Sequence, residues 1–207
     1  MSWTLCTPEQ VNNWPGVRGT IADMSNATQI TAFLRSSRSV RRFSTQSVTG
    51  EVLLDILDVA RWTGSSKNTQ PWHLIAIRDV QTLATLATCG PFAGHLAGAN
   101  AAVVLVMEDG NRRFDEGRLA QNVMLAAWAH GVGSCIASLY PEANNQRARD
   151  LLGIPPTRWV QTAISLGYPA DERALRLSAD RTGLPTVPIG RQELSDLVSW
   201  ERFGESA

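Results

Sequence analysis

The seven residues from 101 to 107, AAVVLVM, are all apolar, and this run constrains the fold more than any other feature of the chain. Asn100 precedes the run, and the polar residues Glu108 and Asp109 follow it. A short apolar run bounded by turn-forming residues is typical of a strand that is buried on both faces. The run is far shorter than the ~20 residues that a membrane-spanning helix needs. We therefore expect covering layers on both sides of a central strand.

The pattern of apolar residues predicts the elements that supply this cover. A long helix from about Phe114 to His130 is apolar around most of its surface, so a domain core or a subunit interface must cover it on several sides. Apolar spacing and capping residues predict further helices that begin near residue 26 and at 49, 80, 141 and about 192. Strands are predicted at 72–77, 134–139 and 160–166. Helices and strands alternate without βαβ regularity, which predicts an α+β domain with a mixed sheet over residues 25–207, preceded by an irregular N-terminal extension at 1–24.

The charge balance and the cysteine count exclude several functions. Nineteen basic residues balance nineteen acidic ones, so the chain has no electrostatic footprint for nucleic acid. The three cysteines lack CxxC spacing, and the three histidines lack helical i, i+4 spacing, so we expect no metal site. No stretch resembles a membrane span or a secretory signal, and we predict a cytoplasmic protein with reduced thiols.

Two polar clusters about thirty residues apart carry the candidate chemistry. The arginine segment, RSVRRF at 38–43, offers guanidinium groups that can grip two phosphate oxygens at once. The amide turn, SSKNTQPW at 65–72, offers Asn68 and Gln70 just before a strand, where Pro71 keeps Gln70 out of a helix. Together these groups suit an anion joined to a flat, hydrogen-bonding ring, such as a phosphorylated flavin. Simpler explanations are a basic helix end that complements the macrodipole and a turn that caps the preceding helix.

These two clusters resemble the signature of the nitroreductase family of FMN-dependent oxidoreductases, which reads RRSxRxF and then Ser-x-x-Asn-x-Gln-Pro-Trp. The similarity continues through QNVMLAA, GVGS, SLGYP and GRQELSDLV, so it covers about residues 26–203. The resemblance implies a nitroreductase-like sheet that is mainly antiparallel and flanked by helices. It also implies a homodimer that binds each FMN between its subunits.

The resemblance further assigns cofactor contacts to individual residues. Arg38 and Ser39 would bind the phosphate and ribityl region, and Arg41 would approach the N1/O2 side of the flavin ring. The remaining implied contacts are Ser65, Ser66, Asn68, Gln70, Ala137, Ser138 and Arg191. The chemistry would take place on flavin N5, so no catalytic side chain is expected.

The resemblance favours an enzyme that passes hydride from NADH or NADPH through flavin N5 to a small electron-poor acceptor, such as a nitroaromatic or a quinone, by a ping-pong scheme. No GxGxxG motif follows a strand, which argues against a separate dinucleotide domain. Three alternatives remain open: a dehalogenase or dehydrogenase on the same scaffold, a non-catalytic flavin-binding protein, and an anion-binding or nucleic-acid-binding module that uses the arginine segment.

Overall fold

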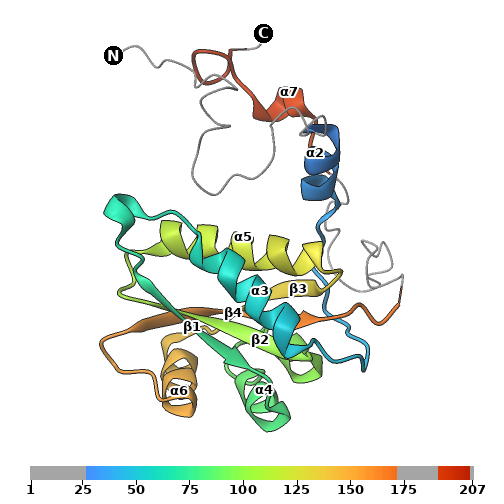
Figure 1. The fold of residues 1–207 in the computed structure, drawn as a ribbon. Coiled ribbons are helices and arrows are strands. Elements are labelled where there is room, and N and C mark those ends of the chain that lie inside the picture. Colours follow the sequence, from blue (N-terminus) through green and yellow to red (C-terminus); the bar gives the residue numbers. More distant parts are fainter. Residues whose placement is uncertain (1–26, 172–190, 206–207) are drawn as a thin grey trace.

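The computed structural model describes residues 27–171 and 191–205. Residues 72–167 include a four-stranded sheet, and helices cover both of its faces (Figure 1). The sheet order is β1-β2-β4-β3, and every pair of neighbouring strands is antiparallel. The strands are β1 (Trp72–Ile77), β2 (Ala101–Met107), β3 (Gly133–Ser138) and β4 (Trp159–Gly167). The predicted α+β class is confirmed. Parallel pairing within the described residues is limited to an isolated bridge between Ser39 and Ser134.

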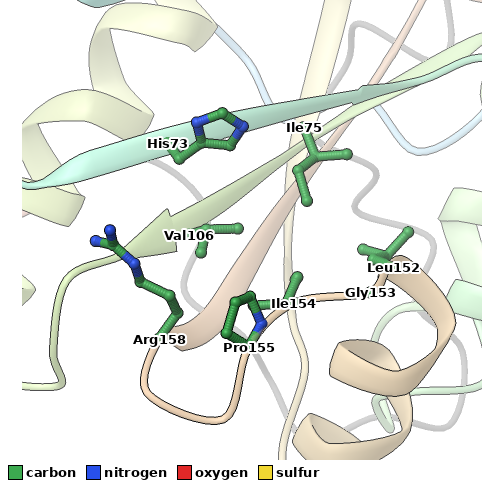
Figure 2. Close-up of a pocket in the computed structure, with 8 residues that line it drawn as sticks. All are labelled: His73, Ile75, Val106, Leu152, Gly153, Ile154, Pro155 and Arg158. Atoms are coloured by element: carbon green, nitrogen blue, oxygen red, sulfur yellow. The ribbon is translucent and has the colours of Figure 1, made fainter.

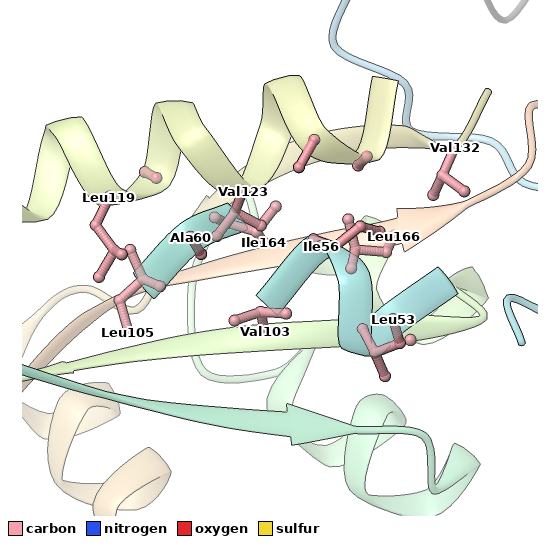
Figure 3. Close-up of a cluster of buried hydrophobic side chains, with 14 of the residues drawn as sticks. Leu53, Ile56, Ala60, Val103, Leu105, Leu119, Val123, Val132, Ile164 and Leu166 are labelled. Atoms are coloured by element: carbon pink, nitrogen blue, oxygen red, sulfur yellow. The ribbon is translucent and has the colours of Figure 1, made fainter. Parts of the chain in front are cut away.

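The larger core lies between the sheet and two helices, α3 (Gly50–Arg61) and α5 (Arg113–Ala129). Figure 3 shows Ile56 of α3 and Val123 of α5 packed over Ile164 of β4, and all three side chains are fully buried. The predicted cap of α3 is confirmed, because the Thr49 hydroxyl accepts a hydrogen bond from the backbone N–H of Val52. The apolar surface of α5 is thus partly covered by α3 and partly by the sheet.

A second core lies on the opposite face of the sheet, below it in Figure 1. Its cover consists of α4 (Val80–Leu86), η3 (Gly94–Gly98) and α6 (Glu142–Leu152). The central strand β2 therefore contributes alternate side chains to two cores, and all of its residues are buried. The prediction that this strand is buried on both faces is confirmed.

Several boundaries differ from the sequence prediction. The helix predicted to begin at 49 ends at Arg61, because the Thr63 N–H and hydroxyl both donate to the carbonyl of Ala60. Residues 94–98 form η3, and the last helix, predicted to begin at about residue 192, is α7 (Leu194–Leu197). Trp62, the residue that follows α3, is 73% exposed. The extension predicted at 1–24 lies outside the described residues.

The arginine segment follows α2 (Ala27–Ser36) and is fastened to the sheet by its backbone. Val40 is fully buried, and its N–H donates to the carbonyl of Ser134 at 2.8 Å. A Cβ atom on Gly133 would lie 2.6 Å from the Cβ of Val40, so the two backbones approach closely because residue 133 has no side chain. The position of the arginine segment is therefore set by contact with β3.

Candidate functional site

The amide turn has an unusual backbone. Lys67, Asn68 and Gln70 have φ angles of 53°, 54° and 47°, in the left-handed region that residues other than glycine seldom adopt. Hydrogen bonds hold this conformation: the Gln70 N–H donates to the hydroxyl of Ser65 at 2.8 Å, and the Glu108 N–H donates to the carbonyl of Pro71 at 2.9 Å. Backbone strain of this kind gathers at binding sites, which makes the turn a candidate for ligand recognition.

The amide turn lies next to the N-terminal half of α5, and most of its polar side chains are exposed. The Arg118 guanidinium donates to the carbonyl of Gly64 at 2.7 Å, and the Asn122 amide donates to the hydroxyl of Thr63 at 2.7 Å. The side-chain amide of Asn68 is exposed and bonds to no group among the described residues. Beside the turn, a cavity of about 470 Å³ is lined by Arg113, Phe114, Gly117, Arg118, Gln121 and Asn122.

The cations of the arginine segment have different environments. The Arg38 guanidinium donates to the carbonyls of Arg35 and Ser37 at 2.6 and 2.9 Å, which matches the simpler explanation of a basic residue at a helix end. Arg42 forms a two-pronged ion pair with Asp171 at 2.8 and 2.9 Å. Arg41 is exposed and lies close enough to His95 to act on it electrostatically. Arg41 is thus the predicted phosphate or ring contact that is best placed to meet a ligand.

The structure buries much of the His95 ring beside the arginine segment. Its Nδ1 lies 2.8 Å from the hydroxyl of Ser165, which in turn donates to the carbonyl of Cys135 at 3.2 Å. Burial lowers the pKa of His95, and the positive charge of Arg41 lowers it further. Both effects favour the neutral imidazole next to Arg41, and no local sequence pattern signals this pairing.

The two predicted clusters do not meet within one chain. The arginine segment follows Ser36, whose hydroxyl accepts a hydrogen bond from Trp128 at the C-terminal end of α5. The amide turn follows Gly64, which bonds to Arg118 near the N-terminal end of the same helix. Ten helical residues separate these two anchors, or about 15 Å along the axis. Figure 1 shows the same arrangement, with the two segments at opposite ends of α5.

The other predicted contacts lie on the edge strand β3 and near the C-terminus. The side chain of Ala137 is buried in the second core, whereas Ser138 is half-buried at the end of β3. Gly90 contacts this end so closely that any Cβ on it would collide with the Ser138 carbonyl oxygen. Arg191 is exposed and precedes α7. The ligand contacts of these residues remain predictions.

Glu116 is a buried acid that the sequence analysis did not single out. Only 7% of its surface is exposed, and one of its carboxylate oxygens has no hydrogen-bond partner among the described residues. It lines a cavity of about 240 Å³ together with Ile136 and Thr162. Burial raises the pKa of the Glu116 carboxyl, while the hydroxyl of Thr162 and the charge of Arg113 oppose this effect. Glu116 lies in the charged first turn of α5, where an acidic residue is usually exposed. The sequence therefore does not signal that this side chain is buried.

We expect Glu116→Gln to stabilise the protein near neutral pH. The folded state raises the pKa of the Glu116 carboxyl above its ordinary value of 4.5. The contribution of this carboxyl to the free energy of unfolding is therefore fully present below pH 4.5, and it is lost as the pH rises through the folded-state pKa. Glutamine does not ionise, so the variant avoids this loss. We expect its free energy of unfolding to rise by about 1 kcal/mol near neutral pH, which is at the low end of the cost of burying a polar group without all of its hydrogen bonds. Urea unfolding at several pH values tests this, and a gain of equal size in acid would contradict it.

Comparisons with known proteins identify the family. The family model described as Nitroreductase family matches residues 34–89 and 92–168, which include both polar clusters and all four strands. This chain belongs to the nitroreductase family. A protein of Archaeoglobus fulgidus that carries the name NADH dehydrogenase/NAD(P)H nitroreductase is 34% identical over 152 residues, which is 70% of this chain and 87% of that protein. The predicted family and the predicted class of enzyme, an oxidoreductase, are confirmed.

Solved structures share the nitroreductase fold. An FMN-dependent nitroreductase from Clostridium difficile has a TM-score of 0.65 and 27% identity, covering 68% of this chain and 88% of that one. A nitroreductase from Desulfovibrio desulfuricans, solved in complex with FMN, has a TM-score of 0.67 and 23% identity, covering 84% and 97%. These neighbours confirm that the sheet and its flanking helices form a nitroreductase fold.

The described part of this nitroreductase-family chain lacks two features of other protein classes. None of its helices has the length and apolar character needed to cross a bilayer. Among the same residues, no three His, Cys, Asp or Glu side chains gather as a metal site would require. Cys89 and Cys135 are free and buried.

Proposed function

We propose that this chain binds FMN and works as an NADH- or NADPH-dependent reductase of a small electron-poor acceptor, such as a nitroaromatic or a quinone. The observation that carries the proposal is the exposed Asn68 amide on a turn with a left-handed backbone. An amide offers both a donor and an acceptor, which the pyrimidine edge of a flavin requires. The FMN held by the Desulfovibrio desulfuricans neighbour supports the same cofactor.

The chain's own residues would bind the cofactor and adjust its charge. When bound, FMN supplies the redox chemistry, since its N5 accepts a hydride from the nicotinamide and delivers it to the acceptor. Arg38 and Ser39 would hold the phosphate, and Arg41 would place a fixed positive charge against the N1/O2 side. Reduction leaves negative charge on that side, so Arg41 would raise the flavin's reduction potential. Donor and acceptor would use the same open face in turn.

We propose further that two copies of the chain complete each site. The arginine segment and the amide turn lie at opposite ends of α5, so a second copy related by a two-fold axis could bring its amide turn to the arginine segment of the first. Apolar side chains that lack cover in the single chain support such an interface. They include Ile30, Leu34, Leu54, Trp62, Phe114, Leu194, Leu197, Trp200 and Phe203.

A visible spectrum of the purified protein, followed by anaerobic titration with each nicotinamide, tests the proposed function. We expect a yellow protein whose flavin absorbance is bleached by NADH or NADPH and returns when a quinone or a nitroaromatic is added. Bound flavin that neither nicotinamide reduces would favour a non-catalytic role or a different donor. A colourless protein that takes up no added FMN would overturn the proposal.

A further inference from the structure

We propose that a cavity under β1 binds a small organic anion with a compact apolar body, such as an aromatic monocarboxylate. The cavity has a volume of about 280 Å³ and lies between β1, β2 and the loop that follows α6 (Figure 2). It opens on the face of the sheet that α4 and α6 cover, opposite α3 and α5. No residue of either polar cluster lines this cavity, and the proposal does not depend on the proposed function.

The floor of the cavity is apolar because residues of the second core line it where the helices no longer cover the sheet. The strand register pairs His73 with Val106, so their side chains lie next to each other on one face. Val106 and Ile154 are buried, and Ile75 of β1 and Pro155 of the loop complete the apolar wall. Ile77, Ile75 and His73 lie on this face of β1, because alternate residues of a strand share a face. The row of apolar side chains therefore ends at the cavity, where His73 contributes an imidazole.

The rim of the cavity carries hydrogen-bond donors and no acid. Figure 2 shows the Arg158 guanidinium and the His73 imidazole toward one side of the cavity, with Leu152 toward the other. Both His73 and Arg158 are exposed, and no acidic side chain is among the lining residues. Within the described residues, the guanidinium of Arg158 takes part in no ion pair. Its planar fork is therefore available to a carboxylate.

The size and the polarity of the cavity limit the class of ligand. Its volume is at the lower limit of the ~300–1,000 Å³ typical of ligand sites, which leaves room for one ring or a branched aliphatic group but not for a nucleotide. An inorganic anion would satisfy the two donors and leave the apolar floor uncovered. A neutral ring would cover the floor and leave the guanidinium without a partner. A small amphipathic anion meets both requirements.

Calorimetric titration of the purified full-length chain with benzoate tests the proposal, with and without added FMN. We expect one benzoate per chain with a dissociation constant at or below about 1 mM. Benzamide, the neutral analogue, and inorganic phosphate should each bind about tenfold more weakly, because each lacks one of the two matching features. Equal binding of benzoate and benzamide, or no saturable binding of benzoate, would overturn the proposal. A perturbed flavin spectrum would also overturn it, since it would place the ligand against the cofactor.

A matched pair of variants locates the bound anion. Arg158→Ala should weaken benzoate binding about tenfold, the scale of one lost charge-assisted hydrogen bond at a partly exposed site. Arg147→Ala is the control, since this arginine of α6 is exposed, lies outside the cavity and bonds to Thr88. It should leave benzoate binding unchanged. Circular dichroism checks that both variants are folded, and an unchanged affinity in folded Arg158→Ala would disprove the site.

Discussion

Mixing two singly substituted proteins, Arg41→Ala and Asn68→Gly, is expected to restore the tight FMN binding that each substitution weakens. If each site takes its arginine segment from one copy and its amide turn from another, a mixed dimer has one doubly altered site and one intact site. Random exchange makes about half of the dimers mixed, so about a quarter of all sites regain full affinity. If one chain supplied both clusters to a site, every site would carry one substitution and mixing would restore nothing.

The size of the effect follows from the groups removed. Loss of the Arg41 guanidinium should weaken FMN binding at least tenfold, because a hydrogen bond to a charged group contributes about 1.5–3 kcal/mol. Loss of the Asn68 amide should have an effect of about the same size, because it removes a donor and an acceptor whose neutral hydrogen bonds contribute about 1 kcal/mol each. Glycine is the replacement at residue 68 because it adopts the observed φ of 54° without strain. Lys67→Gly is the matched control, since the neighbouring lysine has a φ of 53° and no predicted contact with FMN. Quenching of flavin fluorescence measures FMN binding by the three variants and by the unsubstituted protein.

Gly133→Ala is expected to lower the free energy of unfolding by about 3 kcal/mol, at the upper end for an overpacked site. The new methyl group would lie within 2.6–2.9 Å of three side-chain atoms of Val40, and Val40 is fully buried. To relieve this collision, the arginine segment would have to move away from β3, so FMN binding should weaken as well. For a domain of this size the melting temperature should fall by about 6–12 °C.

Two further proteins separate this collision from a general effect of adding a methyl group. Gly98→Ala is the control: its Cβ would have no heavy atom within 4 Å, and we expect a change within about 0.5 kcal/mol. The double variant Gly133→Ala/Val40→Gly should be more stable than the two single costs predict, because glycine at residue 40 removes all three side-chain atoms that the methyl group would meet, including the Cβ at 2.6 Å. Thermal unfolding followed by circular dichroism gives all of these values. Strict additivity would show that the two residues do not collide.

Much of the fold could be predicted from the sequence because its signals are local. The apolar run at 101–107 specified a strand with cover on both faces, and Thr49 specified the start of α3. Pro71 removed Gln70 from any helix, and the structure gives Gln70 a left-handed backbone there. Periodicity and turn chemistry act over a few residues, so each of these features is visible without knowledge of the rest of the chain.

The arrangement of the candidate site was not predictable in the same way. The residue types of the two clusters suggested that both contact one ligand. In the structure, however, α3 carries the chain across the sheet and places the clusters at opposite ends of α5. Glu116 and His95 carry no local sign of burial, because the groups that cover them come from distant strands.

The amino-acid sequence by itself determined the family, the elements and the residue types that could hold a phosphorylated ring. Only the tertiary structure decided which of these residues lie together and which cations already have partners. It also decided that the two clusters lie far apart within a single chain. The physical reason is that helix and strand patterns depend on neighbours along the chain. Burial, ion pairing and the distance between segments depend instead on packing between residues that are far apart in sequence.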